Sequence, residues 1–212
     1  IRQRLKSSLT AHCGRFGAGA HTQDAIAASG SIKILDNTVF TANTAKAHIF
    51  TIVDNHGHVI NLVRNANDDL DGNFIFGLDI DDVGGNFKAD MPHSITYYFG
   101  SDSTVATTAA KILSTFNKAV EAMAAKGTVF GVSAVIDDSD NAKINFTQTE
   151  PGFTGNTKLY VRKVGSDGAT YEDESSLDIK VITFTGGRNA TSRVYRSRAV
   201  FLTPQTGTIS SA

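Results

Sequence analysis

The chain has 212 residues, of which 41% are apolar and 19% are charged, a composition typical of a globular domain and not of a disordered chain. No apolar run approaches the ~18 residues that a membrane-spanning helix needs. The single cysteine, Cys13, excludes an internal disulfide framework and a cysteine-based metal cluster. Residues 1–10 are basic, but no apolar segment follows them, so no signal peptide is expected.

Charge is divided unevenly along the chain. Residues 1–23 contain four basic and no acidic residues, and residues 179–212 contain five basic and no acidic residues. Because the net charge of the whole chain is −1, residues 24–178 must have a net charge of −10. Random clustering of surface charge would give this pattern, and so would basic arms that dock on an acidic neighbouring surface. The candidate interaction residues of these arms are Arg2, Arg4, Lys6, Arg15, Arg188, Arg193, Arg196 and Arg198.

In the first half of the chain, short apolar runs alternate with turn-forming residues, a pattern that predicts strands separated by turns. Residues 1–30 are expected to form an arm, because Gly14, Gly17 and Gly19 interrupt them. A hairpin is expected around the turn sequence Asp-Asn-His-Gly at residues 54–57. The strands expected in this half are 32–35, 47–53, 58–64, 73–79, 86–89 and 94–99.

One segment, about 103–126, has the periodicity of an amphipathic helix. The sequence Ser-Asp-Ser at 101–103 offers an N-cap, and Lys126-Gly127 offers a C-terminal cap. Apolar side chains recur every three or four residues, at Val105, Ala109, Ile112, Phe116, Val120 and Met123.

After the helix, strands are expected again. A second hairpin is predicted over 128–136 and 142–148, and later strands over 158–163, 178–184 and 193–202, followed by a polar tail. We therefore predict an α+β fold, mainly antiparallel β-sheet packed against one long helix. The predicted body spans 31–187, between an N-terminal arm (1–30) and a C-terminal arm (188–212).

Two stretches carry a resemblance to a known family. They are residues 144–157, Ile-Asn-Phe-Thr-Gln-Thr-Glu-Pro-Gly-Phe-Thr-Gly-Asn-Thr, and residues 184–187, Phe-Thr-Gly-Gly. In this order after a helix, they resemble a module of structural proteins of tailed bacteriophages, which implies a virion component and supplies no catalytic residues. Pro151 and Phe153 depart from the family, which usually has small residues there. We expect Gly152, Gly155 and Asn156 to need positive φ, with Asn156 capping its own backbone.

An acidic stretch is the strongest metal candidate in the sequence. Asn67, Asp69 and Asp71 place oxygen atoms at alternating positions before Gly72, as calcium-binding loops do. The twelfth position of such a loop is Leu78 instead of a bidentate glutamate. The alternative, which we prefer, is an acidic loop whose repulsion is relieved by a neighbour's basic arm. Apart from calcium at this loop, no cofactor is expected.

Other motifs are weaker. His56 and His58 can ligate a metal, but the sequence offers no evident third ligand, so they are interpreted as turn residues. Residues 131–135 lack the second glycine of a serine-nucleophile elbow. Nothing marks a nucleophile, a base or a phosphate-binding loop, so the chain is not expected to be an enzyme.

The function predicted from the sequence is that of a non-enzymatic virion structural protein, assembled in the host cytoplasm. A capsid decoration or cement protein would bind the major capsid protein, another virion protein or other copies of itself through its arms. No membrane is expected, and nucleic acid is disfavoured because the acidic body would repel phosphate. The alternatives are a tail, baseplate or fibre component, and an adhesin that stacks Tyr97, Tyr98 or Phe153 on a glycan.

Overall fold

The computed structural model describes residues 20–37, 48–64, 71–76, 93–100, 102–164, 171–173 and 178–194. The contacts divide the chain into two units. The larger unit is Ala25–Asn189, and the smaller unit consists of the two ends, Ile1–Asp24 and Ala190–Ala212.

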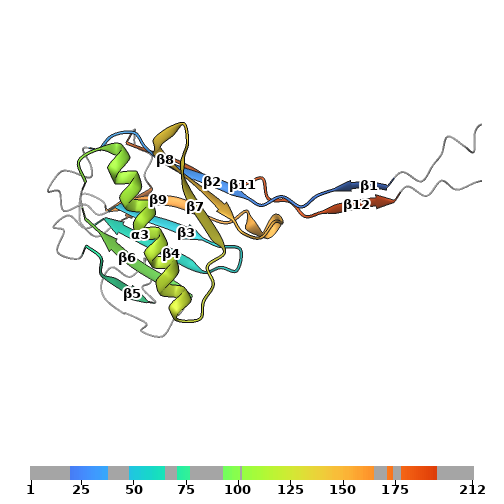
Figure 1. Ribbon diagram of the computed structural model, residues 1–212, viewed down its shortest axis with the longest axis horizontal. Coiled ribbons are helices and arrows are strands. Elements are labelled where there is room, and N and C mark those ends of the chain that lie inside the picture. Colours follow the sequence, from blue (N-terminus) through green and yellow to red (C-terminus); the bar gives the residue numbers. More distant parts are fainter. Residues whose placement is uncertain are drawn as a thin grey trace, which may run out of the picture. The chain divides into compact units, whose positions relative to one another are not determined.

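The larger unit contains two β-sheets and a long helix, which confirms the predicted α+β class (Figure 1). The strands of the six-stranded sheet are, in spatial order, β10 (Tyr171–Asp173), β9 (Leu159–Val164), β3 (His48–Val53), β4 (Val59–Arg64), β6 (Ser94–Phe99) and β5 (Phe74–Phe76). Those of the four-stranded sheet are β11 (Ile179–Thr185), β2 (Ser29–Ile34), β8 (Asp140–Gln148) and β7 (Val132–Asp137). Neighbouring strands are antiparallel except for β4 and β6, which are parallel.

Helix α3 spans Val105–Ala125 and confirms the predicted helix. Its N-cap is Thr104, not the Ser-Asp-Ser sequence at 101–103, because the Thr104 hydroxyl accepts from the Thr107 backbone N–H while the Thr107 hydroxyl bonds back to the Thr104 backbone. The helix ends at Ala125 with Lys126 as its C-cap, and Gly127 adopts a φ of +83°, in agreement with the predicted C-terminal cap. Asn117, Lys118 and Glu121 are exposed on the outer face.

The core lies between the helix and both sheets. The buried face of α3 packs against strands of each sheet, and one continuous apolar cluster includes all three elements. Phe116 of α3 meets Phe146 of β8 edge to face, with ring centroids 5.5 Å apart, and contacts Phe130 at 6.0 Å. The helix therefore ties the two sheets into one body.

Most predicted strands are present, with shifted ends. Both hairpins are confirmed, and the second turns more tightly than expected, with only Asp138 and Ser139 between β7 and β8. Residues 25–30, expected within the N-terminal arm, belong to the larger unit, where Ala28 is buried and β2 begins at Ser29. The predicted strand 86–89 and residues 195–202 lie outside the described residues.

The stretch that carries the phage resemblance forms an internal hydrogen-bond network. The Asn156 side chain donates to the Gly187 carbonyl (3.0 Å) and accepts from the Gly187 N–H (2.9 Å), so it pairs with that backbone as a strand residue would. The expectation that Asn156 has positive φ and caps its own backbone is therefore wrong; its φ is −76°. Gly152 does have positive φ (+143°), whereas Gly155 is needed because a Cβ there would crowd Gln148 and Ala28.

Gly187→Ala should destabilise the body strongly. A Cβ at this position would overlap the backbone carbonyl oxygen of Gly152, which cannot rotate away as a side chain can. We expect a loss of about 3 kcal/mol in urea denaturation. The adjacent Gly186→Ala is the control: its φ of +82° is unfavourable for alanine but no atom lies within 4 Å, so about 1 kcal/mol is expected. Equal losses would contradict this account of the motif.

The β7–β8 turn should respond to acid. Hydrogen bonds from the Ser139 hydroxyl, the Lys143 ammonium and the Asn145 amide hold the pKa of Asp137 well below its ordinary value. A depressed carboxyl pKa stabilises the fold fully above the unfolded value of about 3.9, and this contribution is lost as pH falls through the folded value. Asp137→Asn should therefore lower the melting temperature at neutral pH, with a difference from the wild type that shrinks below about pH 4. A difference that stays constant in thermal circular dichroism from pH 7 to pH 2 would refute it.

Candidate functional site

The two chain ends pair with each other in the smaller unit. Strands β1 (Ala20–Gln23) and β12 (Thr191–Val194) form an antiparallel two-stranded sheet, with Ala20 opposite Val194 and Gln23 opposite Thr191. Within the described residues, neither strand pairs with a third. Strand β1 was not predicted because its four residues, Ala-His-Thr-Gln, lack an apolar alternation.

The structure places two of the predicted arm residues. Arg188 belongs to the larger unit, where its backbone forms a two-way bridge with Ile26 (2.9 and 3.0 Å). Arg193 lies in β12 opposite His21. The other predicted arm residues, Arg2, Arg4, Lys6, Arg15, Arg196 and Arg198, lie outside the described residues.

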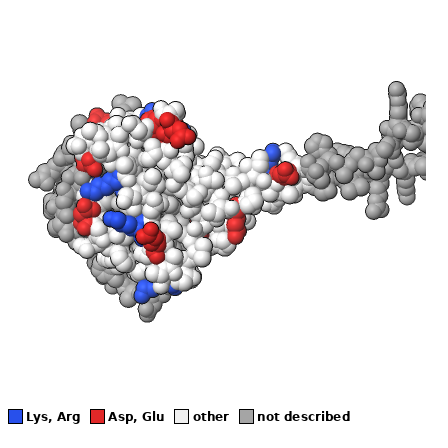
Figure 2. Space-filling view, in the orientation of Figure 1, with Lys and Arg blue, Asp and Glu red and all other residues white. Residues whose placement is uncertain are grey.

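The two units carry opposite net charge. The smaller unit contains seven basic residues and one acidic residue, a net charge of +6, and the larger unit contains 13 basic and 20 acidic residues, a net charge of −7. On the face of the molecule seen in Figure 2, acidic and basic side chains lie in small separate groups and form no single acidic patch.

The predicted calcium loop falls mostly outside the described residues. Asn67 and Asp69 are not described, so the loop stays a prediction. Asp71 is exposed, and its Oδ2 lies 3.1 Å from Nζ of Lys111 on α3. The described part of the acidic stretch is thus paired with a cation of the same chain.

The turn between β3 and β4 is organised by one buried carboxylate. Asp54 is fully buried, and its Oδ1 accepts hydrogen bonds from the backbone N–H groups of His56 (2.9 Å) and His58 (2.8 Å). Its Oδ2 accepts from the Gly131 N–H (3.0 Å) and lies 2.8 Å from Nδ1 of His58. Three backbone donors and one imidazole therefore stabilise a charge whose burial would otherwise be costly.

The same turn is held to the second sheet by Gln148, at the end of β8. Its buried amide donates to the Val53 carbonyl (3.1 Å) and to the Thr157 hydroxyl (2.9 Å), and its carbonyl accepts from the Asn55 N–H (3.1 Å). Glycine is required at position 131, where the backbone passes close to the β3–β4 turn, because a Cβ there would lie 2.7 Å from Asn55 Oδ1. The turn that presents the histidines is therefore anchored from both sheets.

Three histidines gather beside this turn. The rings of His58 and His93 are nearly parallel (8°) with centroids 5.2 Å apart, and those of His56 and His58 lie 5.7 Å apart. The Glu150 carboxylate lies 3.8 Å from His56 Nε2 and accepts a hydrogen bond from the Asn55 side chain at 2.7 Å. Sequence reasoning identified His56 and His58 but missed Asp54, His93 and Glu150.

The sequence does not show that His93 lies beside His58, because this contact depends on the parallel pairing of β4 with β6. Val59 lies opposite Ser94, so the residues just before them, His58 and His93, come side by side, and the Val59 N–H donates to the His93 carbonyl at 2.8 Å. A non-local register of this kind leaves no mark in the spacing of the histidines.

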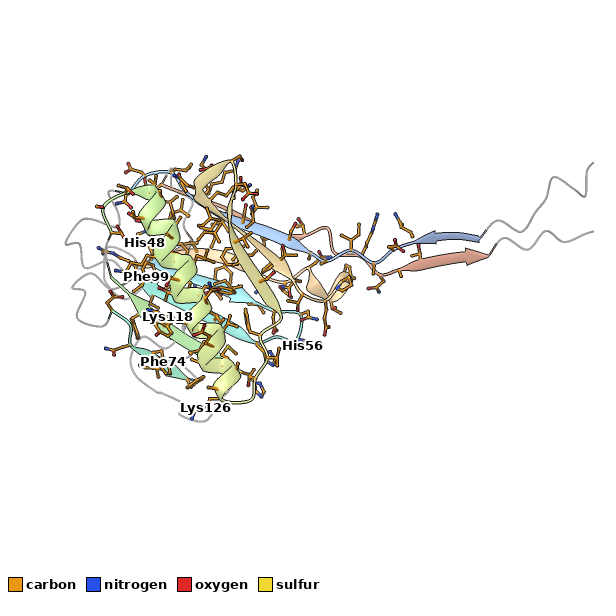
Figure 3. All side chains as sticks on the ribbon, in the orientation of Figure 1. His48, His56, Phe74, Phe99, Lys118 and Lys126 are labelled. Carbon is orange, nitrogen blue, oxygen red and sulfur yellow. The ribbon has the colours of Figure 1, made fainter. Side chains whose placement is uncertain are left out.

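A shallow pocket of about 260 Å³ opens beside the histidines, lined by His56, His58, His93, Gly127, Thr128 and Val129. Figure 3 shows His56 on the same side of the body as Lys126 at the end of α3.

The aromatic side chains predicted to contact a glycan differ in exposure. Tyr97 is buried and stacks on Phe74, with centroids 5.3 Å apart, so its predicted exposure is wrong. Tyr98 is half-buried. Phe153 is 70% exposed, and its backbone N–H donates to Asn189 Oδ1 at 2.9 Å.

Comparisons with known proteins give few matches. No protein-family model matches the chain, and no curated protein is similar to it. Among solved structures, the D2-D3 domains of the flagellar cap protein FliD from Escherichia coli align over 84% of this chain and 73% of theirs, at 16% identity and a TM-score of 0.36. The D1-D2-D3 domains of the same protein align over 84% of this chain and 46% of theirs, at 14% identity and a TM-score of 0.34. Similarity this low carries no argument about function.

Within the described residues, no helix has the length and apolar character needed to cross a membrane.

Asp54→Ala should unfold the β3–β4 turn and loosen its attachment to β7. The substitution removes the acceptor of three backbone N–H groups, one of them from Gly131, just before β7 of the other sheet. We expect a loss of about 3 kcal/mol in urea denaturation, because buried donors without a partner are costly. Asp138→Ala, in the exposed turn between β7 and β8, is the matched control and should change stability by less than about 0.5 kcal/mol. Similar losses for both variants would show that Asp54 has no special role.

Proposed function

We propose that the chain is a non-enzymatic structural protein of a tailed-phage particle, and that it acts as a capsid decoration or cement protein. Its two ends would bind the head shell and other copies of the chain. The observation that carries the proposal is the pairing of β1 with β12, which joins two basic ends, distant in the sequence, into one two-stranded sheet.

A sheet of two strands is marginally stable by itself in water. Strands β1 and β12 each leave an outer edge that pairs with no other strand of the described residues. The edge of a sheet is a place where another protein can add a strand, with main-chain hydrogen bonds supplying the affinity. The two outer edges of this sheet therefore support a role in assembly.

The charges of the two units support the same role. A unit of +6 and a unit of −7 within one chain favour contacts between the ends of one copy and the body of another. Contacts of this head-to-tail kind use two different surfaces, and they close into rings when the rotation between copies allows it. Many weak repeated contacts on a particle would then give strong overall binding.

A second candidate function, glycan binding by a surface adhesin, is favoured by Phe153. This side chain is exposed on a short 3-10 helix (Phe153–Gly155), whose start is held by Asn189 and whose end is held through Asn156. A fixed aromatic ring at the surface is suited to stacking on a sugar. Loss of cell binding in Phe153→Ala, with particle binding retained, would favour this candidate.

Removing the positive charge of the C-terminal end should weaken particle binding. We expect the triple variant Arg193→Gln, Arg196→Gln and Arg198→Gln to bind about ten-fold more weakly at low salt, since exposed ion pairs contribute about 0.2–1 kcal/mol each. The measurement is co-sedimentation with particles that lack the protein. Separate assays with heads and with isolated tails distinguish decoration from a tail or baseplate role.

The matched control replaces Lys118, Lys158 and Lys180 with glutamine. These three lysines are exposed and lie in the larger unit, so the control removes the same charge from the chain without changing its ends. It should bind almost as the wild type does. Wild-type binding by the arginine variant, or equal weakening by both variants, would contradict the role proposed for the ends.

A further inference from the structure

We propose that His56, His58 and His93 bind one divalent transition-metal ion of the Zn²⁺ class, with Asp54 orienting His58. This site is separate from the two chain ends and does not depend on the function proposed for them.

The orientation of His58 suits a metal ligand. Its Nδ1 lies 2.8 Å from the Asp54 carboxylate, so Nδ1 is occupied by that contact and Nε2 is the nitrogen that a neutral ring would offer to a metal ion. A carboxylate behind a histidine is the usual arrangement in metal sites, since it fixes the ring and makes it a better ligand. Asp54 is itself held by three backbone N–H groups, so it acts as a positioning residue and not as a ligand.

Candidate donor atoms lie close together beside the turn. One side-chain donor atom from each of Asp54, His56 and His58 lies within 4.8 Å of the others, and His93 adjoins this group through its ring. Two imidazoles that bind a tetrahedral ion through nitrogen at about 2.1 Å have centroids roughly 5 Å apart. The His58–His93 and His56–His58 separations are 5.2 Å and 5.7 Å. The rings are stacked at 8° and 24°, so no ion lies in the planes of both rings of a pair as they stand. Binding therefore requires that His56 and His93, whose side chains are exposed, rotate about their side-chain bonds and turn a nitrogen toward an ion beside His58.

Hydrogen bonds fix the backbone that carries the proposed ligands. His58 and His93 precede paired residues of two parallel strands and are joined by the Val59 N–H to His93 carbonyl bond. His56 is placed by the turn that Asp54 organises. A site built on strand ends and a hydrogen-bonded turn loses little conformational entropy when an ion binds.

The surroundings favour a cation with an open coordination position. The Glu150 carboxylate lies 3.8 Å from His56 Nε2, and the pocket also includes Gly127, directly after the C-terminus of α3, the end of a helix that favours positive charge. His56 is half exposed and the pocket opens to solvent, which leaves room for water or an outside ligand. Imidazole nitrogen suits zinc, copper and nickel, whereas calcium and magnesium require oxygen ligands.

The test is a metal titration of the full chain without a polyhistidine tag. Isothermal titration with Zn²⁺ should give one ion per chain, and Co²⁺ should give the visible absorption of a tetrahedral site. His56→Ala and His93→Ala should each weaken Zn²⁺ binding about ten-fold or more, the size of effect known even for residues behind the ligands. Both side chains are exposed, so the variants should keep the wild-type circular dichroism spectrum.

Val129→Ala is the matched control, because Val129 lines the same pocket without a ligand atom. It should bind Zn²⁺ as the wild type does. The proposal is overturned if the wild type binds no Zn²⁺ or Co²⁺, or if both histidine variants retain wild-type affinity. It is also overturned if Ca²⁺ raises the melting temperature and Zn²⁺ does not.

Discussion

Asp54 and Gln148 are buried polar side chains that connect the two sheets at one end of the body. Asp54 joins the β3–β4 turn to the backbone just before β7, and Gln148 joins the end of β8 to the backbone of Val53 and Asn55, on either side of Asp54. Each side chain has several specific partners, so a shift of one sheet against the other would leave buried donors or acceptors unpaired. The apolar core drives association of the sheets and α3, whereas these two residues fix the register at which they associate.

This constraint determines where chemistry can occur on the body. A turn whose backbone is held from two sheets presents its side chains in fixed directions, which is the condition for a specific binding site. The histidines beside Asp54 meet that condition, and so does Phe153, which is held through Asn189 and Asn156. The pair β1–β12 is different, because its two strands support only each other among the described residues. It is suited to a partner that completes the sheet rather than to a rigid site.

Local features of this fold were predictable and non-local ones were not. The apolar spacing of α3 and the turn residues of both hairpins were sufficient to predict those elements, because their signals lie within one segment. The pairing of β1 with β12 joins segments about 170 residues apart, and the parallel pairing of β4 with β6 brings His93 beside His58 across a long intervening stretch. The role of Asp54 in joining the sheets was not predictable, because its partner Gly131 lies 77 residues away in the sequence. The N-cap at Thr104 shows that even a local signal fails when neighbouring serine, aspartate and threonine residues compete for one position.

The resemblance to phage structural proteins rests on residues that the body uses internally. Gln148 bonds to the β3–β4 turn, Asn156 bonds to Gly187, and Gly187 packs against the Gly152 carbonyl. Because the polar atoms of these residues bond within the body, the sequence pattern is a signature of the fold. It leaves few polar groups available to recognise a partner. The choice of partner must then depend on segments outside the pattern, which are the charged ends, the histidine cluster and the exposed ring of Phe153. Under the virion role proposed above, those segments and not the body would decide the place on the particle.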